Sequence, residues 1–204
     1  GYDSAGIVLD KDQGNFTVAK TKGKVEDLEN ISKDLKGTAH VGMGHTRWAT
    51  HGVPSDRNSH PHVSNNNKIA LVHNGIIENY DTIKTMLIGK GFTFQSETDT
   101  EVLVNLIQYF MDVDGELSFP EAVRASLNEV YGAYAITVMH DDFPGLLVVA
   151  RLGSPLAIGL GNEEYFIASD ASPFVEFTKE AIYLEEGHMA TISLENGVDI
   201  RSIK

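Results

Sequence analysis

The amino-acid sequence predicts an α+β fold in which antiparallel sheets pack against helices. Short runs rich in β-branched and aromatic residues follow one another through Gly, Asn and Asp turn signals, and the helical patterns cluster in the middle of the chain. A parallel α/β domain would instead alternate strands and helices along its whole length. The chain has 204 residues, with no internal repeat and no Pro/Ser-rich linker, so we expect one domain.

The first part of the chain is predicted to start with a β-hairpin. Strand signals in this part are found at residues 4–9, 15–20, 41–49 and 68–73. Turn signals at residues 10–14 separate the first two strands and indicate a hairpin. Apolar residues at helical spacing predict a short amphipathic helix over residues 25–35, which Gly37 ends.

Three helices are predicted in the middle of the chain. They cover residues 79–90, 98–111 and 118–130. Two capping boxes, Thr98-x-x-Glu101 and Ser118-x-x-Glu121, mark the starts of the second and third helices. In the first helix, the side chains expected to face inward are Ile83, Met86 and Leu87. Further strands are predicted over residues 92–95, 132–139, 145–151, 156–159, 165–168, 181–185, 188–194 and 198–203.

The composition limits the classes of function. Sixteen Lys and Arg against 29 Asp and Glu give a net charge of −13, which disfavours binding to nucleic acids and to anionic membranes. No apolar run approaches the roughly 20 residues that a membrane-spanning helix needs. The absence of cysteine excludes disulfides, thiolate metal sites and a thiol nucleophile within these residues. No secretory signal is recognisable, so we expect a cytoplasmic protein.

The sequence also lacks the motifs of several large enzyme classes. No G-x-G-x-x-G follows a predicted strand, and no Walker motif or G-x-S-x-G elbow is present. Dinucleotide-dependent enzymes, P-loop enzymes and elbow-type serine hydrolases are therefore poor fits to this chain.

The densest group of polar residues lies at residues 45–52. Arg47 carries a planar guanidinium that can bind a carboxylate through two hydrogen bonds. Trp48 is interpreted either as a lid over a small ligand or as an ordinary core residue. An exposed edge strand with its loop is the alternative interpretation of the whole segment.

Asn74 and Gly75 follow the apolar run at residues 69–72. Asn-Gly is the commonest tight-turn dipeptide, so a turn is the first interpretation. The position at the end of a buried strand permits a second one, in which the Asn74 amide and the Gly75 N–H converge on one oxygen. Such donors stabilise a developing oxyanion, and the loss of one typically costs about 3 kcal/mol of transition-state stabilisation.

Asp99 is one of three carboxylates, at residues 97, 99 and 101, in the first turn of a predicted helix. Acidic residues are favourable there because they complement the helix dipole. If Asp99 faced the same cavity as Arg47, the two charges could bind the ammonium and the carboxylate of an amino acid. The sequence alone does not bring them together.

Five histidines lie between His45 and His73, and His60-x-His62 would project from one face of a strand. A metal-dependent hydrolase is therefore kept as an alternative. Against it, no H-E-x-x-H motif is present, and clustered histidines are more often hydrogen-bonded structural groups. We expect neither a metal nor another cofactor.

The chain resembles the glutaminase domains (glutamine amidotransferase type 2) of the glucosamine-6-phosphate synthase family. The motifs are Gly-Tyr-Asp-Ser-Ala-Gly at 1–6, His-Thr-Arg-Trp-Ala-Thr-His-Gly at 45–52, His-Pro-His at 60–62, His-Asn-Gly-Ile-Ile-Glu-Asn at 73–79, Ser-Glu-Thr-Asp-Thr-Glu at 96–101, Gly-Ser-Pro-Leu-Ala-Ile-Gly at 153–159 and Phe-Ile-Ala-Ser-Asp at 166–170. They appear in the family's order and cover nearly the whole chain.

The resemblance implies an N-terminal-nucleophile hydrolase fold, a four-layer αββα sandwich of two antiparallel sheets. It implies hydrolysis of the side-chain amide of L-glutamine to glutamate and ammonia. In a full-length synthase, isomerase domains use that ammonia to convert fructose 6-phosphate to glucosamine 6-phosphate. These domains and L-glutamine are the expected partners, and a homodimer is left open.

The resemblance also implies roles for particular residues. Arg47 would bind the α-carboxylate of glutamine and Asp99 its α-ammonium, while Asn74 and Gly75 correspond to the oxyanion hole. The other pocket residues that it implies are Trp48, as a gating residue, Thr50 and His51.

One feature departs from the family. Its nucleophile is a cysteine at the mature amino terminus, whose own α-amine serves as the base. The 204 residues contain no cysteine and begin at the Gly-Tyr-Asp-Ser-Ala-Gly motif. We therefore expect residues 1–204 to be a glutaminase domain that lacks its first strand and nucleophile, without the isomerase domains, and to be inactive as given. A non-catalytic module that binds glutamine or a partner protein is the alternative.

Overall fold

The structure is a computed structural model that describes residues 2–11, 15–113 and 115–204. Its strands are β1 (Ser4–Lys11), β2 (Asn15–Lys22), β3 (Ala39–Arg47), β4 (His62–Val63), β5 (Ile69–Ile77), β6 (Gly132–His140), β7 (Leu147–Leu152), β8 (Ala157–Leu160), β9 (Tyr165–Ala168), β10 (Ala181–Tyr183), β11 (His188–Ser193) and β12 (Gly197–Ser202). Its helices are α1 (Val25–Ser32), α2 (Tyr80–Gly89), α3 (Asp99–Val113), α4 (Phe119–Glu129) and the short 3₁₀ helix η1 (Ser172–Phe174).

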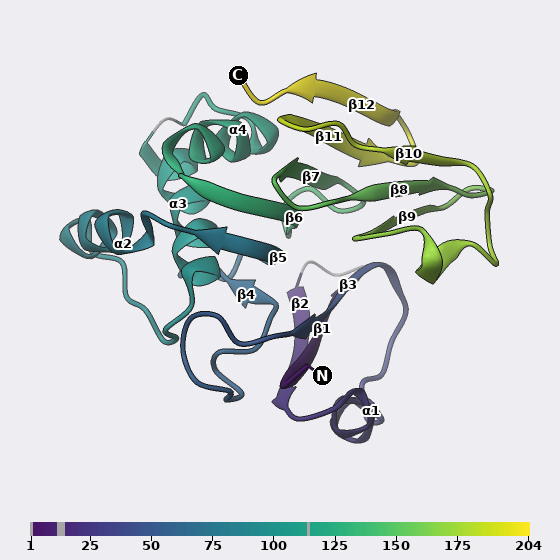
Figure 1. The fold of residues 1–204 in the computed structure, drawn as a ribbon, viewed down its shortest axis with the longest axis horizontal. Coiled ribbons are helices and arrows are strands. Elements are labelled where there is room, and N and C mark those ends of the chain that lie inside the picture. Colours follow the sequence, from purple (N-terminus) through teal and green to yellow (C-terminus); the bar gives the residue numbers. More distant parts are fainter. Residues whose placement is uncertain (1, 12–14, 114) are drawn as a thin grey trace.

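A six-stranded antiparallel sheet forms the centre of the molecule, with the strand order β12-β11-β7-β6-β5-β4. Figure 1 shows α2, α3 and α4 gathered on one side of it, and α1 apart from them beside β1 and β2. The main apolar core lies between this sheet and α2–α4, with Leu71 and Ile136 of the sheet packed in one cluster with Leu103 and Phe119 of the helices. These helices thus cover one face of the sheet.

The second layer consists of two three-stranded antiparallel sheets, ordered β2-β1-β3 and β10-β8-β9. Neighbouring strand residues point to opposite faces, so Val148 belongs to the core under the helices, whereas Val149 packs with Ile158 in the core under β8. A smaller apolar cluster joins Val8 of β1 and Met43 of β3 to β5 and β6. The α+β class and the antiparallel stacking predicted from the sequence are confirmed.

Several local predictions are wrong. Residues 92–95 form no strand, and Met86, which was expected to face inward, is 36% exposed. The turn predicted at Asn74-Gly75 is absent, because β5 continues through both residues and pairs with β6 as far as Ile77. The predicted hairpin at residues 10–14 is confirmed by the antiparallel pairing of β1 with β2, although residues 12–14 of its turn lie outside the described residues.

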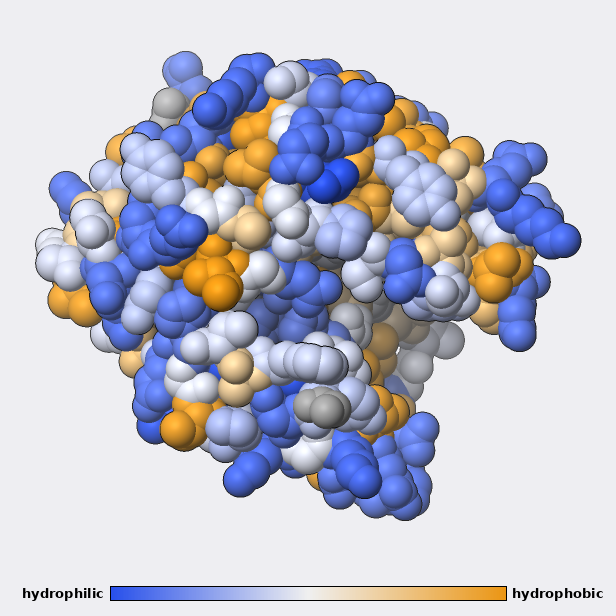
Figure 2. Space-filling model, in the orientation of Figure 1, coloured by the Kyte–Doolittle hydropathy of each residue, from blue (hydrophilic) through white to orange (hydrophobic). Residues whose placement is uncertain are grey.

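The surface in Figure 2 is mainly hydrophilic, with apolar residues interspersed, in keeping with the high content of acidic residues. Within the described residues, no helix combines the length and the apolar character needed to cross a bilayer.

Candidate functional site

A cavity of about 310 Å³ opens where the end of β3, the middle of β5 and the start of α3 meet. Its lining contains six of the seven residues predicted for the site, namely Arg47, Trp48, Thr50, Asn74, Gly75 and Asp99. The seventh, His51, lies beside it, with its Nδ1 3.7 Å from Oδ1 of Asp99. Segments far apart in the sequence are therefore brought together around one space.

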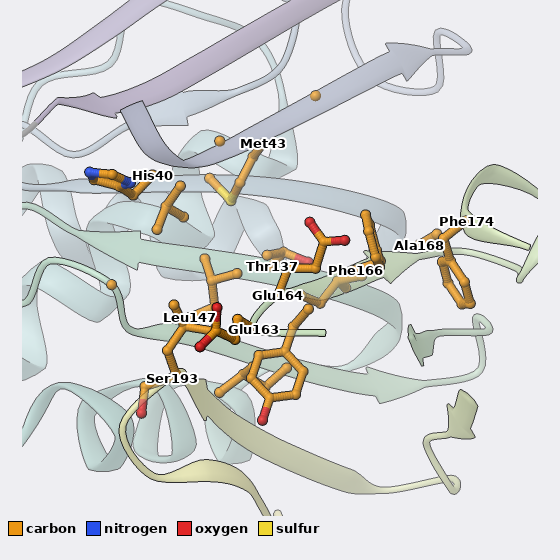
Figure 3. Close-up of a pocket in the computed structure, with 18 of the residues that line it drawn as sticks. His40, Met43, Thr137, Leu147, Glu163, Glu164, Phe166, Ala168, Phe174 and Ser193 are labelled. Atoms are coloured by element: carbon orange, nitrogen blue, oxygen red, sulfur yellow. The ribbon is translucent and has the colours of Figure 1, made fainter. Parts of the chain in front are cut away.

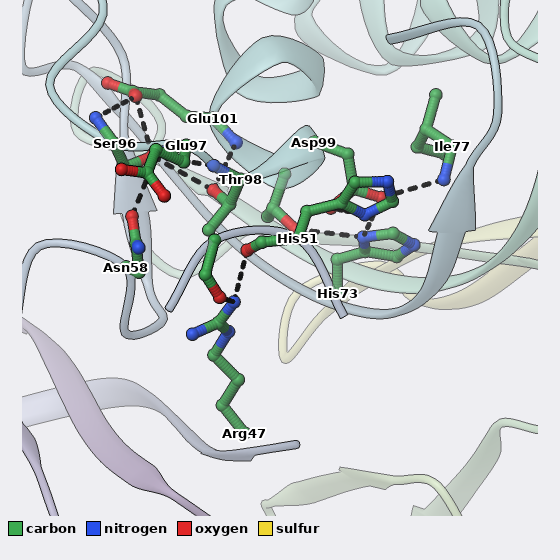
Figure 4. A network of polar contacts seen from close by, with 12 residues as sticks. Arg47, His51, Asn58, His73, Ile77, Ser96, Glu97, Thr98, Asp99 and Glu101 are labelled. Carbon is green, nitrogen blue, oxygen red and sulfur yellow. Dashed lines mark hydrogen bonds and ion pairs between the residues drawn. The ribbon is translucent and has the colours of Figure 1, made fainter. Parts of the chain in front are cut away.

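Arg47 is the last residue of β3, and its side chain is buried. Figure 4 shows its guanidinium reaching toward the start of α3, and Nη2 donates hydrogen bonds to the backbone carbonyls of His51 and Gly52. Nη1 lies 3.8 Å from a carboxylate oxygen of Asp3 and makes no hydrogen bond in the described part of the chain. Burial lowers the pKa of this guanidinium from its usual value, so an anion at Nη1 would stabilise the charge.

Asp99 begins α3 and is almost completely buried. One of its oxygens, Oδ2, accepts a hydrogen bond of 2.8 Å from the backbone N–H of Ile77 at the end of β5. The other, Oδ1, faces His51. The N-terminal end of α3 adds favourable potential for the negative charge, so this carboxylate is held in place and can bind a cation.

Asn74 and Gly75 stand side by side in β5, and the side chain of Asn74 is exposed to the cavity. Gly75 has a φ of +126°, and a Cβ at this position would lie 2.2 Å from the carbonyl oxygen of Ala133 in the neighbouring strand. Only glycine fits there. The strand therefore carries a distortion at the point where it borders the cavity.

Trp48 and Thr50 follow β3 in the loop that borders the cavity. Trp48 is 70% exposed, which makes the interpretation as a core residue wrong. A large exposed side chain on a loop beside a cavity is compatible with a gating role. His51 in the same loop packs edge-on against the ring of Tyr80, with 4.6 Å between the ring centroids.

Asp3 supports this site from outside the cavity lining, a role that its residue type did not indicate. Its backbone N–H donates to the carbonyl of Arg47, and its Oδ2 accepts from the N–H of Ala49. These contacts hold the end of β3 and the start of the following loop. The sequence signal was the position of Asp3 in the Gly-Tyr-Asp-Ser-Ala-Gly motif, which was used only for the resemblance.

The histidines at one wall of the cavity form a packed cluster. The rings of His45 and His60 stack with 4.2 Å between centroids and 13° between planes, and His62 packs edge-on against His60. Burial lowers the pKa of His60 and His62 well below the usual value, so both are neutral at pH 7. In the part of the chain that the structure describes, no three His, Cys, Asp or Glu side chains are grouped to hold a metal ion.

A larger cavity of about 620 Å³ lies elsewhere, between β3, the strands β6 and β7, and the β8–β9 hairpin (Figure 3). Its walls include Met43, Thr137, Leu147 and Phe174, and none of the predicted site residues. The convergent polar groups are in the smaller cavity, which we therefore take as the candidate site.

The comparisons with known proteins all lead to glutamine-dependent amidotransferases and aminotransferases. A family model described as "Glutamine amidotransferase domain" matches residues 5–196. The chain is 52% identical over 195 residues to a glutamine–fructose-6-phosphate aminotransferase (isomerizing) of Bacteroides thetaiotaomicron, covering 95% of this chain and 31% of that protein. It is 50% identical over 199 residues to the protein of the same name from Chlorobaculum tepidum, covering 96% of this chain and 32% of that protein. The chain thus spans about a third of the length of these curated relatives.

Solved structures agree in fold. The glutamine phosphoribosylpyrophosphate amidotransferase of B. subtilis, complexed with ADP and GMP, superimposes with a TM-score of 0.81 at 30% identity, covering 100% of this chain and 44% of that chain. A glutamine aminotransferase class-II domain protein of Silicibacter pomeroyi, at 13% identity and a TM-score of 0.64, shares the fold. The N-terminal-nucleophile fold expected from the resemblance is confirmed by these neighbours.

Proposed function

The chain belongs to the glutamine amidotransferase domain family, and on this basis we propose that its cavity binds L-glutamine and positions the side-chain amide for hydrolysis. The observation that carries the proposal is the shared cavity, in which a buried guanidinium and a buried carboxylate accompany an Asn-Gly pair. Free glutamine has one carboxylate, one ammonium and one amide, which match these three features in charge and hydrogen bonding.

In the proposed complex, Arg47 binds the α-carboxylate of glutamine and Asp99 binds its α-ammonium. Thr50 and His51 line the pocket, and Trp48 closes over the ligand. Holding both charged ends fixes the direction in which the side-chain amide extends. The amide carbonyl then meets Asn74 and Gly75.

Hydrolysis proceeds by attack of a nucleophile on the amide carbon, which converts the carbonyl oxygen to an oxyanion. Donors from Asn74 and Gly75 stabilise that charge. The C–N bond then breaks, a proton is transferred to the leaving nitrogen, and ammonia departs, after which water releases glutamate. In the family this nucleophile is an amino-terminal cysteine, and residues 1–204 contain none, so it has to come from outside these residues. We therefore propose that residues 1–204 alone do not turn over glutamine.

The names of the relatives suggest how the ammonia is used. Two proteins with half of their aligned residues identical to this chain are glutamine–fructose-6-phosphate aminotransferases. We therefore propose that the domain supplies ammonia for the amination of fructose 6-phosphate to glucosamine 6-phosphate, through isomerase domains that residues 1–204 do not include. A cytoplasmic location fits this use.

A binding experiment on the 204-residue chain tests the proposed pocket. Isothermal titration calorimetry with L-glutamine should detect binding to the wild-type chain without ammonia release. Arg47→Ala and Asp99→Asn should each weaken binding at least about 10-fold, because each leaves one charged end of the ligand unpaired. Arg57→Ala is the matched control, since Arg57 is an exposed arginine that pairs with Glu97 outside the cavity and should leave affinity unchanged.

Three results would contradict the proposal: no binding to the wild-type chain, equal affinity in Arg47→Ala and the wild type, or ammonia release by the 204-residue chain itself. Activity is tested in a chimaera that joins the amino-terminal, cysteine-bearing segment of the Bacteroides relative to this chain. The chimaera should release ammonia from glutamine. A chimaera that binds glutamine and releases nothing would support the alternative of a non-catalytic glutamine-binding module.

A further inference from the structure

His45 links the two sheet layers at the wall of the cavity. It comes from β3, and its Nε2 lies 2.8 Å from the side-chain oxygen of Asn74 and 3.1 Å from the backbone carbonyl oxygen of His73. Both partners belong to β5, in the six-stranded sheet. A single nitrogen atom thus contacts two oxygens of the strand that carries the predicted oxyanion donors.

The chemistry of these groups fixes where the hydrogens are. A backbone carbonyl only accepts, so the Nε2 of His45 must carry a hydrogen in order to bond to His73. The atom of Asn74 that faces the same N–H must then be its amide oxygen, because the NH₂ group would meet a second donor. The Asn74 Nδ2 therefore points away from His45, and it makes no hydrogen bond to the described residues.

The imidazole of His45 is itself held in place. Its ring stacks on the ring of His60, and the hydroxyl of Thr100 lies 3.4 Å from Nε2 of His60. The backbone N–H of His73 donates to Nδ1 of His60 at 3.4 Å. Burial lowers the pKa of His45, and its buried Nδ1 has no hydrogen-bond partner in the described part of the chain, as expected for a neutral ring with its hydrogen on Nε2.

We infer that His45 is a positioning residue, whose Nε2–H binds the oxygen of the Asn74 amide and so directs the Asn74 NH₂ group toward the amide oxygen of the substrate. The inference rests on the proposed function, since the oxyanion is that of glutamine hydrolysis. The hydrogen bond from His45 orients the Asn74 amide independently of any contact with the ligand. Without His45, the amide could rotate by 180° and present its oxygen to the developing negative charge.

Steady-state kinetics of the cysteine-bearing chimaera test this role. His45→Leu should lower kcat about 10- to 100-fold, because Asn74 is still present but its NH₂ group is no longer directed at the substrate. This decrease in kcat is at most about as large as the one expected when an oxyanion donor is removed. KM for glutamine should stay within about 3-fold, because Arg47 and Asp99 bind the charged ends. His45→Gln can place an N–H near the position of Nε2, so its kcat should recover to within about 5-fold of the wild type.

A matched control is His140→Leu, which removes another buried imidazole, at the far end of β6 from Gly75, and should leave kcat and KM unchanged. The inference is overturned if His45→Leu keeps the wild-type kcat, if it changes KM alone, or if His45→Gln is as slow as His45→Leu. If the wild-type chimaera itself releases no ammonia, the proposed function has failed.

A spectroscopic test on the 204-residue chain is independent of turnover. Long-range ¹H–¹⁵N correlation spectra at pH 7.5 should show His45 as the neutral tautomer with its hydrogen on Nε2. In the wild-type chain, the Asn74 side-chain NH₂ group should give one pair of signals, because the amide has one orientation. In His45→Leu, signals averaged over two orientations of the amide should replace that pair. A hydrogen on Nδ1 of His45 would overturn the inference whatever the kinetics show.

Discussion

Gly75 occupies a backbone position that other residue types cannot adopt without displacing the neighbouring strand. Its φ of +126° is unfavourable for any L side chain, and the added carbon would overlap the carbonyl of Ala133 at 2.2 Å. The glycine thus allows β5 to stay paired with β6 while it borders the cavity. Both the stability of the sheet and the shape of the site depend on it.

Gly75→Ala should lower the free energy of unfolding by about 2–4 kcal/mol, through backbone strain and overlap with β6. Urea denaturation followed by circular dichroism would measure the change. Gly89→Ala is the matched control, because Gly89 lies in α2 with no atom within 4 Å of the added carbon. It should be neutral or stabilise the helix by up to about 1 kcal/mol. Equal stability of the two variants would contradict the assigned strain.

At the scale of single residues, charge and hydrogen-bonding capacity singled out Arg47, Asp99 and Asn74 as candidates, and all three line one cavity in the structure. Their neighbours were harder to predict. His45 acts through one hydrogen bond between strands that are distant in the sequence, and Asp3 acts on the backbone of β3. Such roles depend on tertiary placement, which a residue's type does not reveal. Trp48 was ambiguous for the same reason.

At the scale of elements, the start of α3 is organised by one buried carboxylate. Glu101 was predicted to complete a capping box with Thr98. Its side chain instead accepts hydrogen bonds from the backbone N–H groups of Gln95 and Ser96 and from the Ser96 hydroxyl. Thr98 still caps the helix through its own hydroxyl, which accepts from the N–H of Glu101. The segment before α3 is thereby tied to the turn that carries Asp99.

Glu101→Ala should destabilise the protein by about 2–3 kcal/mol, because it leaves buried N–H groups without their charged acceptor. Thermal unfolding by differential scanning calorimetry would measure the loss. Glutamine binding should weaken as well, since the helix start that presents Asp99 would loosen. The control is Glu121→Ala, because Glu121 is a first-turn glutamate of α4 whose carboxylate lies 3.9 Å from Arg124 at the surface. This change should alter stability by less than about 0.5 kcal/mol. A Glu101→Ala protein as stable as this control would contradict the assignment.

Elements with strong local signals were predicted well. Ser118 accepts from the N–H of Glu121 at the start of α4, which is one of the two hydrogen bonds of the predicted capping box. The strand prediction for residues 92–95 was wrong because a short apolar segment can be buried without pairing with another strand. Phe92 and Phe94 pack on the main core in this way. At Asn74-Gly75, the pairing of β5 with β6 prevailed over the local preference for a turn.

At the scale of the whole molecule, the buried histidines make stability dependent on pH. The pKa values of His45, His60, His62 and His73 are all lowered by burial, so the unfolded chain binds protons more readily than the folded one. Stability is therefore full above the unfolded pKa of about 6.5 and decreases as the pH falls below it. Each histidine that stays neutral in the fold costs about 1.4 kcal/mol per pH unit in that range.

Urea denaturation at pH 7.5 and pH 5.5 should show a lower free energy of unfolding at pH 5.5, by about 1–4 kcal/mol in total. The double variant His60→Gln/His62→Gln removes two of the titrating groups. Its stability should therefore depend less steeply on pH than that of the wild type, even if it is less stable overall. Equal stability of the wild type at the two pH values would contradict the neutral state of these rings.

The small apolar cluster of Val8, Met43, Ala70 and Met139 has a consequence for motion. Arg47 and His45 belong to β3 of the sheet β2-β1-β3, whereas Asn74 and Asp99 belong to the body built around α3 and the six-stranded sheet. The apolar cluster between the two bodies is much smaller than the core inside the helical body. Local opening would therefore begin at the contact between the two bodies. Separation at this contact would move Arg47 and His45 away from Asn74 and Asp99 while the helical body stayed folded. Ligand binding would therefore be lost before the protein unfolds globally.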